Sequence, residues 1–89
     1  MTQKVLADVL MKYGRADRQD DLLRLASDTT VSLFVSVGEE TLNIHRVNAL
    51  ELLHDVLVIH TSRQERYVVV YEDVRAIHFG APNSKPGLV

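Results

Sequence analysis

The sequence contains no cysteine, and several other absences also limit what the chain can be. Without cysteine, disulfides and thiolate zinc sites are excluded, which fits a reducing cytoplasm. The longest apolar runs, such as Val56 to Ile59, are far shorter than the roughly twenty residues that a membrane-spanning helix needs. Met1 to Lys4 leads into an amphipathic stretch that contains Asp8, which is wrong for a signal peptide. We therefore expect a cytoplasmic protein with no membrane partner.

Glycine-rich loops and an excess of basic residues are also missing. Only 4 glycines occur and none of them cluster, so the sequence has no glycine-rich phosphate-binding loop. Ten Lys and Arg against 12 Asp and Glu give a formal net charge of -2, which excludes a general attraction to nucleic acid or anionic membranes. Any contact with RNA must therefore be local.

What is present is the composition of one small folded domain, with 89 residues, 46% hydrophobic and 25% charged. A domain of this size buries only roughly 60% of the surface that its unfolded chain exposes, so its stability is low. Small domains often gain stability by self-association. We expect an N-terminal extension helix at 1–16, a helix plus a β-barrel at 17–80, and a flexible C-terminal tail at 81–89. The prolines and polar residues that follow Gly80 favour the flexible tail.

Helical spacing marks the first quarter of the chain. Residues 2–13 predict an amphipathic helix that Thr2 caps and Gly14 ends. Its predicted apolar stripe is Val5, Leu6, Val9, Leu10 and Tyr13. A second helix is predicted from Asp17 to Ser27, with Leu22, Leu25 and Ala26 on one face. The pair could be a helix-turn-helix, but the acidic residues of the second helix favour packing over DNA binding.

From Val31 onward the sequence predicts five short strands separated by brief turns. The first strand has a period of two residues. We expect one set to face the core, namely Val31, Leu33, Val35 and Val37, and the residues between them to face away, namely Ser32, Phe34 and Ser36. The second strand centres on Leu42 and Ile44, and the third contains the continuous apolar run Val56 to Ile59. Residues 67–71 and 74–79 complete the set, with Glu72-Asp73 between them. The pattern is typical of a mainly β protein with a small antiparallel barrel.

The sequence offers no recognisable catalytic or metal-binding motif. His45, His54, His60 and His78 have no ligand spacing, so we assign no metal and no cofactor. His54 and Asp55 are adjacent, and consecutive strand residues should point to opposite faces rather than form a catalytic couple. We therefore assign no catalytic residue and expect a non-enzymatic protein.

Together, the helix, the strand VSLFVSVG at 31–38, the Gln19-Asp20 pair and a closing strand after Tyr71-Glu72-Asp73 resemble the Sm/Lsm-like family. In layout the likeness is greatest to its bacterial branch, the Hfq RNA chaperones, and it covers about residues 18–80. The resemblance implies a strongly bent, five-stranded antiparallel barrel, of the kind shared with SH3-like domains. It also implies a ring of about six or seven subunits, in which the fourth strand of one subunit pairs with the fifth strand of the next.

The predicted subunit interface follows from this ring and from the apolar character of the last two strands. It consists of Tyr67, Val68, Val69, Val70, Tyr71, Val74, Ile77 and Phe79. In the chaperones, a Lys and a His after the Tyr bind uridine-rich RNA at the pore, together with a Gln from the helix. Here those positions hold Glu72 and Asp73, and only Gln19 matches, so the pore position is acidic.

Three functions remain open at this point. The first is an Sm-like homo-oligomeric scaffold or binding domain with an undefined ligand. The second is an RNA-binding Sm-like protein that uses its rim, through Gln19, Arg63, Arg66 and Arg75, with Tyr67 or Tyr71 stacking on bases. The third is a monomeric SH3-like module that binds other proteins.

Overall fold

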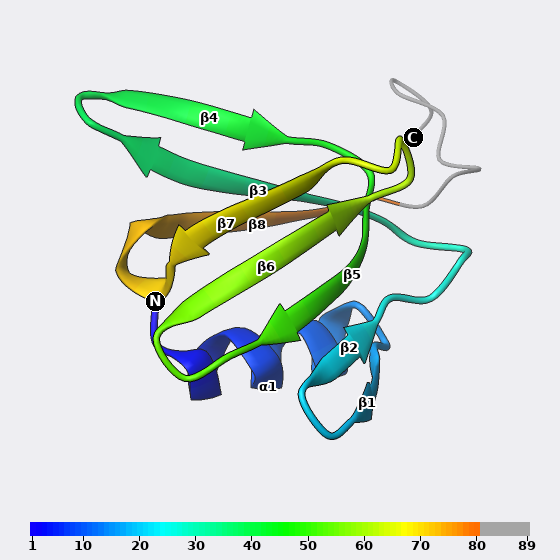
Figure 1. The fold of residues 1–89 in the computed structure, drawn as a ribbon. Helices are drawn as coiled ribbons and strands as arrows, with labels where there is room; N and C mark the ends of the chain where they lie inside the picture. The colour runs from blue at the N-terminus through cyan, green and yellow to red at the C-terminus, as the bar shows by residue number, and fades with distance from the viewer. Residues whose placement is uncertain (81–89) are drawn as a thin grey trace.

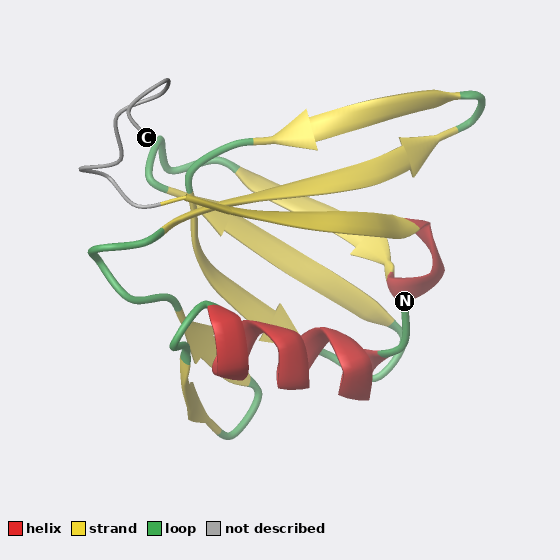
Figure 2. Ribbon diagram, turned by 180° about the vertical axis from the view of Figure 1, so that it is seen from behind, coloured by secondary structure: helices red, strands yellow, loops and turns green. Residues whose placement is uncertain are grey.

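The computed structural model describes residues 1–80 and shows a mainly β protein with one N-terminal helix (Figures 1 and 2). The elements are α1 (Gln3–Tyr13), β1 (Asp17–Gln19), β2 (Leu22–Arg24), β3 (Thr30–Val37), β4 (Glu40–Ile44), β5 (Val47–Leu52), β6 (Val56–Thr61), β7 (Arg66–Val70), the 3-10 turn η1 (Tyr71–Asp73) and β8 (Val74–Gly80). All strand pairs are antiparallel, in a five-stranded sheet of order β1-β2-β5-β6-β7 and a three-stranded sheet of order β4-β3-β8. These sheets do not close into a barrel within residues 1–80. The tail predicted at 81–89 lies outside the described residues.

Helix α1 confirms the first helical prediction. The Thr2 hydroxyl accepts a hydrogen bond from the Val5 amide at 3.2 Å, and Gly14 ends the helix, where its amide donates to the Leu10 carbonyl at 3.0 Å. Leu6, Ala7 and Leu10 are buried against the strands, and both views show α1 lying beneath them. The predicted stripe was wrong at Val5, which is 48% exposed, and at Tyr13, which also faces outward. No helix within residues 1–80 is long and apolar enough to span a bilayer.

The predicted second helix at 17–27 was wrong, because these residues form the β1–β2 hairpin. Asp20 adopts a positive φ of 55°, which Asp tolerates better than most residues, and this conformation turns the chain between Gln19 and Leu22. Leu23 is fully buried and pairs with Leu50 of β5. Asp residues have low helix propensity, and the burial of Leu23 together with backbone pairing outweighs the short apolar spacing that suggested a helix.

Strands β3, β4 and β8 build the smaller sheet largely as the alternation predicts. Val31, Leu33 and Val35 of β3 are buried in the core, but the prediction that Val37 faces the core was wrong, because its side chain is 56% exposed. The two-residue turn between Val37 and Glu40 begins with Gly38 at a φ of 63°, a conformation that glycine adopts without strain. As Figure 1 shows, this turn lies at the tip of a hairpin that extends beyond the other sheet.

The predicted second strand is divided into β4 and β5, which belong to different sheets. His45 and Arg46 separate them, and Arg46 has a φ of 56°, an uncommon value for a residue other than glycine. Beyond this bend, Leu50 and Leu52 alternate inward and pair with Ile59 and Leu57 of β6. The bend thus allows one continuous stretch of chain to connect the two sheets around a shared core.

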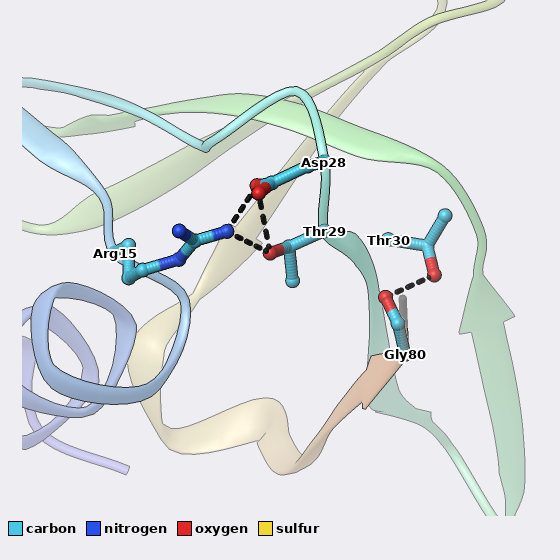
Figure 3. A network of polar contacts seen from close by, with 5 residues as sticks. All are labelled: Arg15, Asp28, Thr29, Thr30 and Gly80. Carbon is cyan, nitrogen blue, oxygen red and sulfur yellow. Dashed lines mark hydrogen bonds and ion pairs between the residues drawn. The ribbon is translucent and has the colours of Figure 1, made fainter. Parts of the chain in front are cut away.

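Polar contacts on the protein surface join the loop that follows α1 to the loop that precedes β3 (Figure 3). The Arg15 guanidinium contacts the Asp28 carboxylate and lies 3.3 Å from the Thr29 hydroxyl. Nearby, the Thr30 hydroxyl donates to the Gly80 carbonyl at 2.6 Å, which joins the start of β3 to the end of β8. The hydrogen bond from Arg15, followed by a smaller effect of its charge, lowers the pKa of Asp28 below its ordinary value.

This lowered pKa predicts a small pH dependence of stability. A depressed carboxyl pKa stabilises the fold above the ordinary pKa of Asp, near 4, and the contribution is lost as pH falls through the lower folded-state value. We expect the melting temperature of the wild type to exceed that of Asp28→Asn slightly at pH 7 and to converge with it below about pH 3. Thermal melts from pH 7 to pH 2 measure this. Asp17→Asn is the matched control, and a constant gap between wild type and Asp28→Asn across this range would contradict the expectation.

Candidate functional site

Among the surface hollows of residues 1–80, three gather side chains with distinct chemistry. The acidic hollow, of about 760 Å³, is lined in part by Asp20, Asp21, Glu51, His60 and Glu65. It lies where the β1–β2 hairpin meets β5, β6 and the β6–β7 turn. The other two are a cationic hollow near the same turn and a valine-lined groove near η1. Each brings together segments that are distant in the sequence.

In the acidic hollow, the most ordered polar contact is between His60 and Glu51. His60 Nε2 lies 2.6 Å from Glu51 Oε1, and both side chains are partly exposed on the outer face of the β5–β6 pair. A carboxylate that orients an imidazole is one component of acid–base sites. The only hydroxyl lining this hollow belongs to Thr61, which is buried and lies 3.4 Å from Glu65 Oε1. The hollow therefore contains an oriented imidazole but presents no accessible hydroxyl nucleophile from its own lining.

The cationic hollow, of about 550 Å³, takes its positive charge from Arg46 and Arg63, with His45, His78 and Tyr67 also in its wall. These residues come from the β4–β5 bend, the β6–β7 turn, strand β7 and the end of β8. Glu65 is the one carboxylate of the lining. This hollow thus carries an excess of positive charge on a chain whose net charge is -2.

The valine groove, of about 600 Å³, lies between the end of β3 and β7. Its lining includes Val37, Val68 and Val70, whose side chains are 56%, 64% and 42% exposed. Asp73 of η1 and Arg75 of β8 line the same groove, and the Arg75 Nε atom donates to the Ser36 hydroxyl at 2.6 Å. The groove is therefore an exposed apolar surface with a charged border.

The eight predicted interface residues occupy three environments. Tyr71 and Val74 are buried in the core of the single chain, and the Tyr71 hydroxyl donates to the Leu53 carbonyl at 2.6 Å. Val68 and Val70 are exposed on β7. The remaining members are half-buried and pack against the core, namely Tyr67, Val69, Ile77 and Phe79. Within this set, Val68 and Val70 are thus the side chains that a neighbouring molecule could cover most completely.

The residues predicted to contact RNA line different hollows. Gln19 and Arg66 line the acidic hollow, Arg63 lines the cationic hollow, and Arg75 lines the valine groove. Gln19 lies at the end of β1 rather than on a helix, so it does not match the helical Gln of the family pattern. Glu72 is exposed on η1. Tyr67 and Arg63 both line the cationic hollow.

Two further sequence-based inferences concern histidine. The expectation that His54 and Asp55 point apart was wrong, because they lie in the β5–β6 turn, where His54 Nδ1 is 2.9 Å from Asp55 Oδ1. Both side chains are almost fully exposed, so this contact is solvated. Within residues 1–80 no three His, Asp or Glu side chains are grouped as metal ligands.

Sequence reasoning missed Arg46 as a candidate binding residue. One signal was available, because His45-Arg46 places two consecutive polar residues between Ile44 and Val47 and thereby interrupts the strand alternation. Such a break indicates a bend or a bulge, where the direction of the side chains changes. Its proximity to Arg63 could not be read from the sequence, because it depends on the pairing of β5 with β6.

A scan against protein-family models, a search of curated proteins and a search of solved structures each found no match to this chain.

Proposed function

We propose that this chain is a non-enzymatic binding domain that assembles with copies of itself, by adding strand β8 of one copy to the edge of β7 in the next. The observation that carries the proposal is the exposed valine surface of β7. Val68 is 64% exposed and Val70 is 42% exposed, on a strand at the outer edge of its sheet. Edge strands with exposed apolar side chains tend to pair with another chain unless charge, proline or a bulge prevents it.

Strand β7 has little of this protection. Its only charged residue is Arg66 at its start, it contains no proline, and its pairing with β6 is regular over all five residues. The exposed Val37 lines the same groove, so the apolar surface extends beyond the strand itself. A second copy of the chain can supply a matching edge, because β8 pairs with β3 on one side and ends its own sheet within residues 1–80.

The strand order supports an Sm-like or SH3-like interpretation of the domain. If β4 and β5 are counted as one bent strand, then β3, β4–β5, β6, β7 and β8 make five consecutive antiparallel strands, with β8 returning to pair with β3. The 3-10 turn Tyr71–Asp73 occurs where the resemblance expects its Tyr-x-x turn. Pairing between two different edges is heterologous, and such contacts form a ring when the rotation from copy to copy closes on itself. We propose a ring of about six or seven subunits, as the resemblance implies.

Replacing Val68 with lysine tests this assembly. The substitution places a charge within the β7–β8 contact, where burial without a partner is unfavourable, and the single chain should tolerate it because Val68 is largely exposed. We expect light scattering to give a multiple of 10.0 kDa for the wild type and a mass near 10.0 kDa for Val68→Lys. Val5→Lys is the matched control, because Val5 is a similarly exposed valine on α1, and it should keep the wild-type mass.

The outcomes separate the hypotheses. A wild-type chain that remains a monomer would contradict the proposal and favour the monomeric SH3-like module. An oligomer that Val68→Lys leaves intact would show that another surface mediates assembly. Circular dichroism of each variant verifies that any loss of mass does not reflect unfolding.

A further inference from the structure

We propose that the cationic hollow is a binding site for a nucleoside phosphate, with Arg46 and Arg63 holding the phosphate and Tyr67 contacting the base. Its residues all come from one chain, so the site does not depend on the proposed assembly. Glu72 and Asp73, the positions where the family resemblance places a pore, are not part of its lining.

The backbone holds the two arginines in one place. The Ser62 amide donates to the Arg46 carbonyl at 2.9 Å, and Ser62 immediately precedes Arg63. The β6–β7 turn is closed by two further hydrogen bonds, from the Thr61 amide to the Glu65 carbonyl and from the Gln64 amide to the Thr61 carbonyl, both at 3.0 Å. A turn that is fastened in this way holds its backbone in place before binding, so less entropy is lost when a ligand binds.

Arg46 also occupies an unfavourable backbone conformation. Its φ of 56° lies in the left-handed region, where side chains other than glycine, Asn and Asp are uncommon. Such conformations persist where the surrounding structure enforces them, and they cluster at ligand sites. Glycine or asparagine would fit this bend with less strain than arginine.

Both arginines are available for an anion. Within residues 1–80 the ion pairs are Arg15–Asp28, His54–Asp55 and His60–Glu51, and none of them uses Arg46 or Arg63. The lining carboxylate, Glu65, has its Oε1 atom 3.4 Å from the Thr61 hydroxyl. Two guanidinium groups with one carboxylate leave a local surplus of positive charge, which suits a phosphate.

The rest of the lining supplies further polar groups. The Ser32 hydroxyl, the Asn43 amide and the rings of His45 and His78 border the hollow, as does Thr30, whose hydroxyl donates to the Gly80 carbonyl. The Ser32 hydroxyl lies 3.4 Å from His45 Nδ1, which links two of these groups. Phosphoryl oxygens accept several hydrogen bonds at once, so donors from several strands around two arginines suit a phosphate better than a carboxylate.

The size of the hollow and its aromatic wall extend the assignment from phosphate to nucleotide. A volume of about 550 Å³ is large for inorganic phosphate and lies within the usual range for small-molecule sites. Tyr67 is half-buried and packs against the core, which fixes its ring. A fixed aromatic ring beside arginines is a stacking surface for a nucleobase.

Isothermal titration of the full chain tests this site, with UMP, AMP, uridine, inorganic phosphate and hexauridylate as probes at low and high salt. We expect UMP and AMP to bind at least about tenfold more tightly than uridine, because charged hydrogen bonds to phosphate are the strong contacts. The double variant Arg46→Ala and Arg63→Ala should weaken UMP at least about tenfold. Arg18→Ala with Arg24→Ala is the charge-matched control, from the β1–β2 hairpin, and should bind UMP as the wild type does.

A third variant separates the base contact from the phosphate contact. Tyr67→Leu keeps an apolar side chain but removes the ring, so it should weaken UMP while leaving inorganic phosphate unchanged. The titration with hexauridylate shows whether the site binds a free nucleotide or a nucleotide within an RNA strand. Binding more than tenfold tighter than UMP, and sensitive to the same two arginines, would indicate an RNA strand, whereas equal or weaker binding would indicate a free nucleotide.

Three results would overturn the assignment. They are no binding of UMP or AMP at low salt, equal binding of UMP and uridine, and equal losses in the arginine double variant and its charge-matched control. Amide NMR spectra of each variant show whether the fold is retained. If the arginine double variant unfolds, Arg63→Gln alone provides the same comparison, because Arg63 lies in an exposed turn.

Discussion

Replacing Leu23 with alanine is expected to lower the free energy of unfolding by about 2–5 kcal/mol. Leu23 is fully buried, where β2 pairs with β5, and its removal would leave a cavity beneath the β1–β2 hairpin. A chain of 89 residues has about 4–13 kcal/mol of stability in total, so this loss is a large fraction of it. Urea unfolding followed by circular dichroism measures the change.

Leu22→Ala is the control variant that distinguishes a hairpin from a helix at residues 17–27. A helix at 17–27 would bury Leu22, whereas in the hairpin Leu22 is half-buried beside the acidic hollow. We expect Leu22→Ala to cost much less than Leu23→Ala. A larger loss for Leu22→Ala would mean that the segment is helical after all.

Replacing Leu10 with alanine is expected to cost a similar amount, about 2–5 kcal/mol. Leu10 is fully buried on the face of α1 that packs against the strands, and alanine keeps the helix propensity high. The loss therefore reports the docking of the helix rather than its formation. Thermal or urea unfolding measures it.

Val5→Ala is the matched control for the helix. Val5 belongs to the stripe predicted from spacing but is 48% exposed, so its replacement by alanine should change stability by less than about 0.5 kcal/mol. If Val5→Ala and Leu10→Ala cost the same, then α1 packs on a different face from the one described.

How much of this fold the sequence predicts depends on the kind of pattern each element carries. Strand β3 was predicted because Val31, Leu33 and Val35 repeat with a period of two residues. That period is typical of a strand with one buried face. Val37 continues the period but lies at the end of a hairpin that extends past the core, which only the tertiary arrangement reveals. Local periodicity identifies an element but does not fix how far the core extends along it.

The β1–β2 hairpin shows where local patterns mislead. Each of its strands has only three residues, too few to display a period of two, and Leu22 and Leu25 happen to match helical spacing. The decisive interaction is the pairing of Leu23 with Leu50, which are far apart in the sequence. Short strands that depend on a distant partner are not predictable from their own residues.

The candidate sites were predicted only in part, for the same reason. Tyr67 and Arg63 were singled out from the sequence, and the structure places them in one hollow. Arg46 and His78 come from a bend and a strand end whose positions follow from sheet pairing. The valines of β7 are apolar by residue type, but which of them remain accessible depends on the packing of β7 against the core.

We propose that β7 and β8 join copies of this chain into a closed ring. Native mass spectrometry of the wild-type protein over a hundredfold range of concentration tests it most directly. We expect one dominant species of about six or seven copies of the 10.0 kDa chain, with a subunit number that does not change with concentration. A 10.0 kDa monomer at every concentration would contradict it.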